Sequence, residues 1–165
     1  MEVLSIPGVG GILEKQIDGT EYILIQERWK EEAPNETGLI EIPAGKIRAF
    51  ENIFDCLCRE IKEETGLDIV KINEEDESQI IELNGYKVLN YHPFSCSQNI
   101  MGNYPVMVQV FICKVKGEVI KESNETKNLR WISIKDLKRK LETEKDKFYP
   151  MHVKTLEDYI IYKGY

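Results

Sequence analysis

Apolar residues along the chain either alternate with polar ones or run together in short segments, which is the pattern of β-strands. The segments with this pattern cover residues 3–14, 22–28, 39–43, 68–72, 79–83, 86–91, 106–115 and 129–132. Asp18-Gly19 follows the first segment and Asn84-Gly85 divides 79–91, and such dipeptides favour tight antiparallel turns. The segment 106–115 is the most hydrophobic, so it is predicted to lie at the centre of a sheet.

Residues 53–65 repeat apolar side chains every three or four positions, which predicts an amphipathic helix. Asn52 is a suitable N-cap, and Gly66 is suited to end the helix in a left-handed conformation. The stripe expected to pack against the sheet consists of Ile53, Phe54, Leu57, Cys58 and Ile61. The helix is therefore predicted to be held firmly by the sheet while its acidic edge stays open.

The order of the elements predicts an α+β fold. Two further helices are expected late in the chain, one capped by Ser133 and reaching Leu141, the other over residues 151–162. Because strands stand on both sides of the first helix, we expect a mixed sheet packed between helical layers. The 165 residues fit a single domain, since no linker or repeat divides them.

The first helix concentrates negative charge on one face. Glu60, Glu63 and Glu64 are three or four positions apart or adjacent, so their carboxylates are neighbours on the helix. Like charges at these spacings destabilise a helix unless a cation compensates them. An all-oxygen cluster is suited to Mg²⁺ or Mn²⁺, so the sequence predicts a divalent-metal site on this face.

The spacing of charged residues and glycines around this helix matches a known signature. The matching positions are Gly45, Glu51, Arg59, Glu60, Ile61, Glu63, Glu64, Gly66 and Leu67. In this respect the chain resembles the Nudix hydrolases, whose signature is G-x5-E-x7-R-E-U-x-E-E-x-G-U, with U a bulky aliphatic residue. The resemblance implies an α/β/α sandwich and a metal-dependent pyrophosphohydrolase that acts on a nucleoside diphosphate linked to another group.

The resemblance and the spacing together assign candidate roles. Glu60, Glu63 and Glu64 are the expected metal ligands, and the resemblance adds the carbonyl of Gly45. The catalytic group is expected to include Glu60 and Glu64, supported by a second charged pair. This supporting pair, Glu51 and Arg59, is predicted to form an ion pair across one end of the helix.

Two carboxylates are candidates for the general base. Glu60 is fixed on the helix and can deprotonate a bound water. Glu125 precedes Trp131 by six residues, and in this it resembles a downstream glutamate of several Nudix hydrolases. It is expected on a polar loop that can close over the site, and the reading of Glu125 as an ordinary surface charge stays open. Neither His92 nor His152 is assigned a catalytic role.

Only the resemblance to the family narrows the range of candidate substrates. The segment Ile42-Pro43-Ala44-Gly45 resembles the branch of the family that acts on ADP-ribose and other sugar nucleotides. Phe94 and Tyr104 lie in a long loop suited to recognising a base or a ribose, and Arg28 is a further substrate-binding candidate. Trp29 is expected to pack in the core rather than stack on a base. The alternatives are a housecleaning nucleoside triphosphate pyrophosphatase and a nucleotide sensor without activity.

Charge and cysteine content limit the partners and the compartment. A net charge of -7 argues against a broad surface for nucleic acid, although a small anion held through a divalent metal remains compatible. No apolar segment is long enough to span a membrane, and no signal peptide is recognisable, so a cytoplasmic location is expected. Cys56 and Cys58 are interpreted as reduced, buried thiols. Whether the chain is a monomer or a homodimer is left open.

Overall fold

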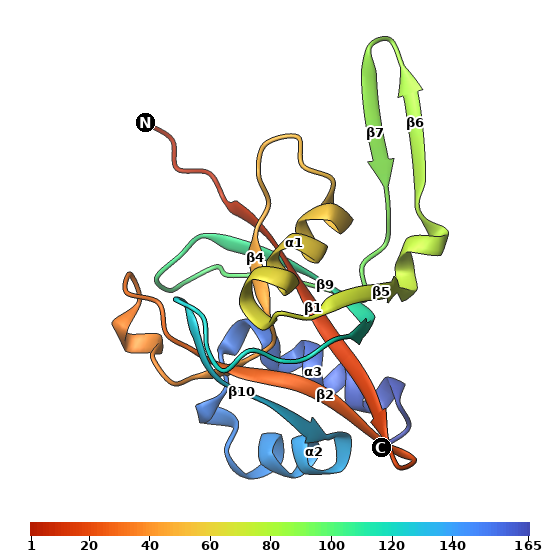
Figure 1. The fold of residues 1–165 in the computed structure, drawn as a ribbon. Coiled ribbons are helices and arrows are strands. Elements are labelled where there is room, and N and C mark those ends of the chain that lie inside the picture. The colour runs from red at the N-terminus through yellow and green to blue at the C-terminus, as the bar shows by residue number, and fades with distance from the viewer.

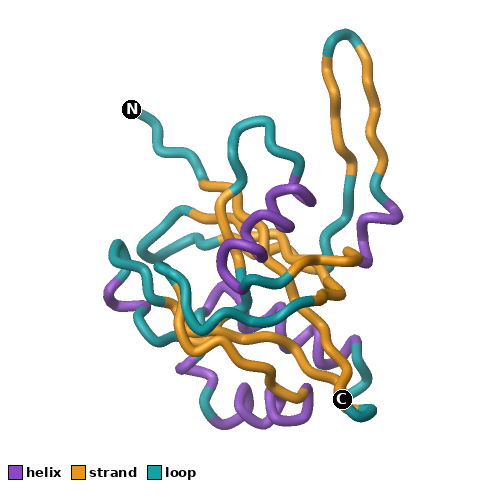
Figure 2. Tube along the Cα trace, in the orientation of Figure 1, coloured by secondary structure: helices purple, strands orange, loops and turns teal.

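The computed structural model describes residues 1–165 and contains a mixed sheet, a separate hairpin and three α-helices (Figures 1 and 2). The strands are β1 (Ile6–Ile17), β2 (Thr20–Arg28), β3 (Ile40–Glu41), β4 (Ala44–Lys46), β5 (Asp68–Ile72), β6 (Gln79–Leu83), β7 (Tyr86–Asn90), β8 (Ser95–Gln98), β9 (Val106–Lys116) and β10 (Thr126–Ser133). The helices are α1 (Ile53–Thr65), α2 (Ile134–Thr143) and α3 (Pro150–Tyr162). Short 3₁₀ turns cover Pro34–Glu36, Asn73–Glu77 and Lys145–Lys147.

The main sheet has the strand order β10-β2-β1-β9-β5. Its central strands β1 and β9 are parallel, and the remaining pairs are antiparallel, so the predicted mixed sheet and central position of β9 are confirmed. Strand β4 also pairs with β1, and it lies very close to it. A Cβ atom on Gly8 would be 3.2 Å from the Gly45 carbonyl oxygen, and one on Gly10 would be 3.2 Å from the Ala44 Cβ. Glycine in β1 therefore allows β4 to approach.

Two apolar cores lie on opposite faces of the sheet. On one face, Leu13 and Phe111 pack with the Leu57 side of α1. On the other face, Ile12 and Ile112 belong to a core that includes α2 and α3. Successive residues of a strand point to opposite faces, so neighbouring positions in β1 and β9 supply both cores. The predicted arrangement of a sheet between two helical layers is confirmed (Figure 1).

Helix α1 has the predicted bounds and caps. The Asn52 side chain accepts a hydrogen bond from the Phe54 N–H at 2.9 Å, and Gly66 adopts a left-handed φ of 78°. The prediction of two buried thiols was wrong for Cys58, which is exposed, whereas Cys56 is fully buried. Cys58 lies at the margin of the arc that faces the sheet, and Cys56 packs on its other margin, next to β4.

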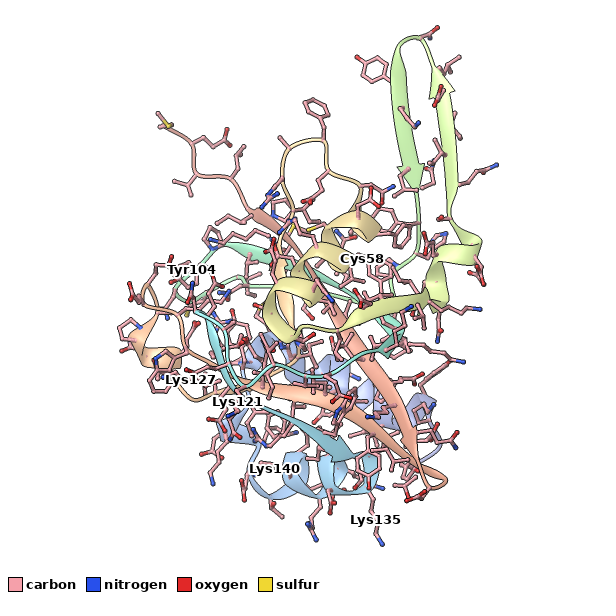
Figure 3. The ribbon with its side chains drawn as sticks, in the orientation of Figure 1. Cys58, Tyr104, Lys121, Lys127, Lys135 and Lys140 are labelled. Atoms are coloured by element: carbon pink, nitrogen blue, oxygen red, sulfur yellow. The ribbon has the colours of Figure 1, made fainter.

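Trp29 and the segment after β7 also differ from expectation. Trp29 is not a core residue: its side chain is exposed, and the Lys127 ammonium lies 4.0 Å from the ring centroid (Figure 3 labels Lys127). The expected long loop after β7 contains the short strand β8, which pairs with β9. The predicted hairpin β6–β7 is present and projects away from the sheet (Figure 1). None of the helices combines the length and the apolar content that crossing a membrane would require.

Candidate active site

A cavity of about 190 Å³ opens where β4, the N-terminal end of α3 and the loops after β2 and β8 meet. Acidic and basic side chains share its lining with apolar strand residues. The lining residues are Ile6, Gly8, Arg28, Lys30, Glu32, Ala44, Gly45, Lys46, Glu60, Tyr104, Val106, Val108, Glu125, Tyr149 and His152. Most of them come from segments far apart in the sequence, so the fold, and not local spacing, assembles this site.

Glu60 reaches the cavity from α1 and lies directly against the backbone of β4. A Cβ atom on Gly45 would be 1.9 Å from the Glu60 Cδ, so only glycine leaves room for the carboxylate in this position. Arg59 Nη1 donates a hydrogen bond to Glu60 Oε1 at 2.5 Å. The Glu60 carboxylate is therefore held between a glycine and a guanidinium.

The predicted ion pair between Arg59 and Glu51 is present and has two contacts. Arg59 Nε donates to Glu51 Oε1 at 2.8 Å, and Nη2 donates to Oε2 at 3.0 Å. The pKa of Glu51 is lowered to about 2 by the Arg59 hydrogen bonds and by the Arg48 backbone N–H. Because the same guanidinium binds Glu60, the pair positions Glu60 as well as the loop before α1.

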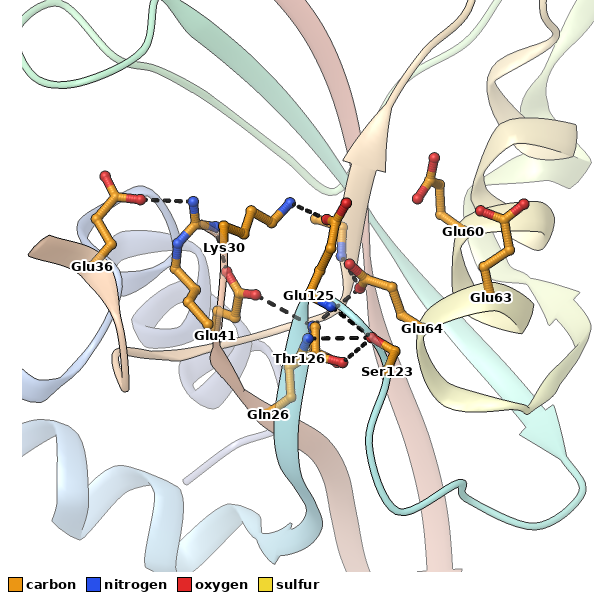
Figure 4. A network of polar contacts seen from close by, with 12 residues as sticks. Gln26, Lys30, Glu36, Glu41, Glu60, Glu63, Glu64, Ser123, Glu125 and Thr126 are labelled. Atoms are coloured by element: carbon orange, nitrogen blue, oxygen red, sulfur yellow. Dashed lines mark hydrogen bonds and ion pairs between the residues drawn. The ribbon is translucent and has the colours of Figure 1, made fainter. Parts of the chain in front are cut away.

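Glu64 is buried, whereas the spacing of the three glutamates predicted an open acidic edge. Its Oε2 accepts hydrogen bonds from Gln26 Nε2 at 3.0 Å and from the Ala44 N–H at 3.1 Å (Figure 4). Gln26 Nε2 also lies 3.3 Å from Glu41 Oε1, so one amide bridges two buried carboxylates. Burial and repulsion from Glu41 raise the pKa of Glu64 to about 8. The ionised carboxylate thus lacks a cationic partner in hydrogen-bonding contact.

The three carboxylates of α1 fit a divalent cation in chemistry, although their side chains do not converge in this structure. Glu64 points toward Gln26, while the Glu60 and Glu63 carboxylates stand apart from it (Figure 4). No group of three His, Cys, Asp or Glu side chains is placed to hold a metal ion. All the donors are carboxylate oxygens, the type preferred by Mg²⁺ and Mn²⁺, and the hydrogen-bonding contacts of buried Glu64 come from an amide and a backbone N–H, not from a cation. Rotation of the Glu60 and Glu63 side chains is needed to complete such a site.

Glu125 reaches the cavity from the segment just before β10. Its Oε2 lies 2.8 Å from Lys30 Nζ, and this contact lowers the pKa of Glu125 (Figure 4). The backbone there is tied down, since the Trp29 N–H donates to the Glu125 carbonyl at 2.8 Å and Ser123 Oγ accepts from the Glu125 N–H at 3.2 Å. Glu125 is therefore a cavity residue on a tethered segment, and its carboxylate can move by side-chain rotation.

The wall opposite α1 contains a buried arginine. Arg28 Nη1 donates to Glu41 Oε2 and Nη2 donates to Glu36 Oε2, each at 2.7 Å. The Tyr149 ring covers the guanidinium, with 3.9 Å from Cζ to the ring centroid. Burial opposes the charge, but Glu41 and Glu36 outweigh this and raise the pKa of Arg28. Arg28 is thus permanently charged and already paired with two carboxylates.

The other sequence candidates are distributed unequally around the cavity. Tyr104, on the loop between β8 and β9, lines it (Figure 3). Phe94 is not brought to it, because its ring packs against Tyr159 and Tyr162 of α3. Glu63 is the most exposed of the three α1 carboxylates. Glu60, Arg28, Gly45 and Glu125 are brought together.

Lys30, Gln26 and His152 belong to the site but were missed from the sequence. Gln26 and Arg28 carried a usable signal, since polar residues at alternate positions in an apolar strand such as β2 indicate a polar buried contact. Lys30 stands in a polar loop and His152 in a helix, where neither has a distinctive spacing. Only the fold brings them to the cavity.

Comparison with known sequences identifies one domain type. The family model described as NUDIX domain matches residues 6–152. The chain is 44% identical over 61 residues to Nudix hydrolase 8 of Arabidopsis thaliana, a region of 37% of this chain and 15% of that protein. A second curated Nudix relative, from Caenorhabditis elegans, is 30% identical over 131 residues, or 77% of this chain and 28% of the relative. The chain thus spans a minor part of the length of both relatives.

Comparison with solved structures gives the same fold. The MutT protein of Methanosarcina mazei superimposes with a TM-score of 0.63 at 21% identity, covering 100% of this chain and 99% of that one. The NUDIX domain of Shewanella oneidensis NrtR, solved in complex with ADP ribose, gives a TM-score of 0.60 at 13% identity, covering 84% and 79%. At these identities the likeness concerns the fold alone.

Proposed function

Because this chain belongs to the Nudix family, we propose that it is a metal-dependent pyrophosphohydrolase that cleaves a nucleoside diphosphate linked to another group. The observation that carries the proposal is the buried carboxylate of Glu64, which has no cationic partner and stands beside a cavity edged by Glu60. A site of this charge needs a cation before it can accept a diphosphate. Members of the family generally use divalent metal cations, and Mg²⁺ or Mn²⁺ suits these oxygen donors.

The α1 carboxylates Glu60, Glu63 and Glu64 would hold the cation, with the Gly45 carbonyl as a further ligand. When bound, a divalent ion makes a water more acidic and neutralises phosphoryl oxygens. Lys30 and Lys46 line the same cavity and can contact the remaining phosphate charge. Arg59 and Glu51 act as positioning residues, because their contacts hold Glu60.

The proton of the attacking water needs an acceptor, and two carboxylates are in reach of the cavity. Glu125 is our preferred base. Its partner Lys30 can bind a substrate phosphate instead, and this would free the Glu125 carboxylate as the substrate binds. Glu60 is the alternative. Its carboxylate already accepts a hydrogen bond from Arg59 Nη1.

A sugar nucleotide of the ADP-ribose type is the favoured substrate class. The resemblance of residues 42–45 to that branch supports it, as does the likeness in fold to a NUDIX domain that binds ADP ribose. Nucleoside triphosphates are the second class, and they are supported by the likeness in fold to MutT proteins.

A panel of substrates separates these classes. The purified chain is incubated with Mg²⁺ and with either a diphosphate-linked sugar nucleotide or a nucleoside triphosphate, and the phosphate products are identified by ³¹P NMR. Two monophosphates from the sugar nucleotide support the proposal, whereas pyrophosphate released from triphosphates supports the second class. If neither class is cleaved, the hydrolase proposal is wrong and a sensing role takes its place.

A further inference from the structure

Buried polar atoms without a hydrogen-bond partner are concentrated at the cavity. The structure contains four such side-chain atoms: Gln26 Oε1, Arg28 Nε, Tyr104 Oη and His152 Nε2. Three of the four residues, Arg28, Tyr104 and His152, line the cavity. Because a buried polar atom without a partner is unfavourable, a group of them at one place indicates a ligand that completes their hydrogen bonds.

His152 is fixed as a neutral hydrogen-bond donor. Its Nδ1 accepts a hydrogen bond from the Ile42 backbone N–H at 3.2 Å, so the ring proton is on Nε2. Burial, together with the charges of Arg28 and Lys30, lowers the pKa of His152 to about 3, and the ring stays neutral at physiological pH. With 1% of its surface exposed, the side chain has no access to bulk water as a substitute partner. The free Nε2–H therefore requires an acceptor.

Arg28 contributes a donor but no spare charge. Both of its terminal nitrogens donate to carboxylates, Glu41 and Glu36, and Nε is the one side-chain nitrogen without a partner. A phosphate at this point would face those two carboxylates, so an anion is disfavoured. An uncharged acceptor meets the hydrogen-bonding requirement without this repulsion.

Tyr104 stands on a loop that is bound to the same network. Asn99 Nδ2 donates to the Tyr104 carbonyl at 2.7 Å, and Asn103 Nδ2 donates to Glu36 Oε1 at 3.1 Å. These contacts hold the loop beside Arg28, which Glu36 also binds. The loop that carries Tyr104 therefore lies on the same wall as Arg28, and the unpartnered hydroxyl belongs to a residue that lines the cavity.

We propose that Arg28, Tyr104 and His152 form a donor-lined subsite for a carbonyl-bearing edge of the nucleobase, as in hypoxanthine, guanine or uracil. The inference rests on the proposed function, since it assigns the base of the same nucleotide substrate. The hypoxanthine and guanine edge presents two neighbouring acceptors, N7 and O6, whereas adenine presents an acceptor beside an amino donor. Arg28 Nε and His152 Nε2 can only donate, so the amino group of adenine would bring N–H groups against N–H groups. Within the sugar nucleotides the subsite therefore selects an oxo base in the place that adenine takes in ADP-ribose.

The test compares inosine-diphosphate ribose and adenosine-diphosphate ribose, whose purines carry an oxygen and an amino group, respectively, at position 6. Both ligands carry a methylene group in place of the oxygen that bridges the two phosphates, so that hydrolysis does not contribute, and binding is measured by calorimetry with Mg²⁺ present. We expect the hypoxanthine ligand to bind the unmodified chain about 10-fold more tightly, since one good hydrogen bond is exchanged for an unpaired donor. Tyr104→Phe and His152→Asn should each reduce this preference to about 2-fold or less. Asn is chosen because its amide oxygen can keep the Ile42 contact while the Nε2 donor is lost.

The matched control is Tyr86→Phe, which removes an exposed hydroxyl from the tip of the hairpin and should keep the full preference. Equal binding of both ligands, tighter binding of the adenine ligand or no measurable binding of either would overturn the inference. A third ligand, the 2′-deoxy form of the hypoxanthine ligand, tests whether the acceptor oxygen is the ribose 2′-hydroxyl. If removing this hydroxyl weakens binding more than the change at position 6 does, the donors bind the ribose and the inference is wrong. A base preference without hydrolysis in Mg²⁺ would instead reject only the proposed function.

Discussion

The two walls of the cavity differ in how they are built and in what they offer a ligand. The α1 wall takes its carboxylates from one stretch of helix, Glu60 to Glu64, and no cation is in hydrogen-bonding contact with the buried Glu64. The opposite wall takes Arg28, Tyr104 and His152 from three distant segments and offers uncharged or already paired donors. We therefore propose that the α1 wall carries out the chemistry and that the opposite wall recognises the substrate.

The largest effect is expected from Glu64→Gln. Loss of the buried charge removes a metal ligand, so turnover should fall by about 100-fold or more while the fold is retained. Because burial raises the pKa of Glu64 to about 8 from its usual 4.5, the charged form costs folding stability as the pH rises through this window. In chelator at pH 8, the variant should therefore melt no lower than the unmodified chain.

Turnover and thermal melting of Glu64→Gln are compared with those of Glu142→Gln, which changes an exposed glutamate on α2. The control should match the unmodified chain in both measurements. If Glu64→Gln turns over substrate at the unmodified rate, the α1 wall is not the chemical wall.

A smaller effect, about 10- to 100-fold, is expected from Glu125→Gln, and it should appear in kcat far more than in KM. The carboxylate is proposed to take a proton rather than to bind the substrate, so its loss slows the chemical step. Steady-state kinetics on a sugar nucleotide measure kcat and KM separately. An unchanged kcat would make Glu125 a surface partner of Lys30 and Glu60 the preferred base.

For the opposite wall, the expected signature is in the pH dependence of folding stability and not in the turnover number. The pKa of His152 is lowered to about 3 from the ordinary 6.5, so below pH 6.5 the unfolded chain binds a proton that the folded chain does not. The contribution of His152 to stability is complete above pH 6.5 and is lost as the pH falls toward 3. Between pH 7 and pH 4 this loss is on the order of 3 kcal/mol.

Chemical denaturation of the unmodified chain and of His152→Asn at both pH values isolates this contribution. The variant should lose less stability on acidification, because it has no histidine to protonate in the unfolded state. Equal losses in the two proteins would mean that His152 is not held neutral by burial.

The smallest effects concern the cysteines of α1. Cys56→Ser should lower the free energy of unfolding by about 1–2 kcal/mol, because it buries a hydroxyl beside β4, and Cys58→Ser should change it by less than about 0.5 kcal/mol. Neither should alter kcat. Denaturant titration of both variants checks the difference, and a larger loss for Cys58 would contradict the packing of α1.

The sequence predicted the α1 wall well because its information is local. Caps, helix bounds and the Glu51–Arg59 pair all depend on spacing within one segment, and the structure has each of them. Burial of Glu64 was also accessible, since Glu64 is three residues after Ile61 and seven after Leu57 and so falls inside the apolar stripe. The prediction of one exposed acidic face was therefore wrong for Glu64.

The opposite wall could not be predicted in the same way. Its residues meet only because β2, the loop before β9 and the start of α3 converge, and nothing in the local sequence of His152 indicates that its ring faces a cavity. Trp29 illustrates the same limit, because an aromatic residue at a strand end can equally pack inside or lie under a lysine outside.

The most direct test of the central claim is turnover of a sugar nucleotide by the chelator-treated chain as Mg²⁺ is added back, measured in parallel with Glu64→Gln. We expect no turnover without the metal and saturable recovery in the unmodified chain. At every Mg²⁺ concentration the turnover of the variant should be lower than that of the unmodified chain by about 100-fold or more. Full turnover in excess chelator, or identical recovery curves for the two proteins, would contradict the assignment of hydrolysis to the carboxylates of α1.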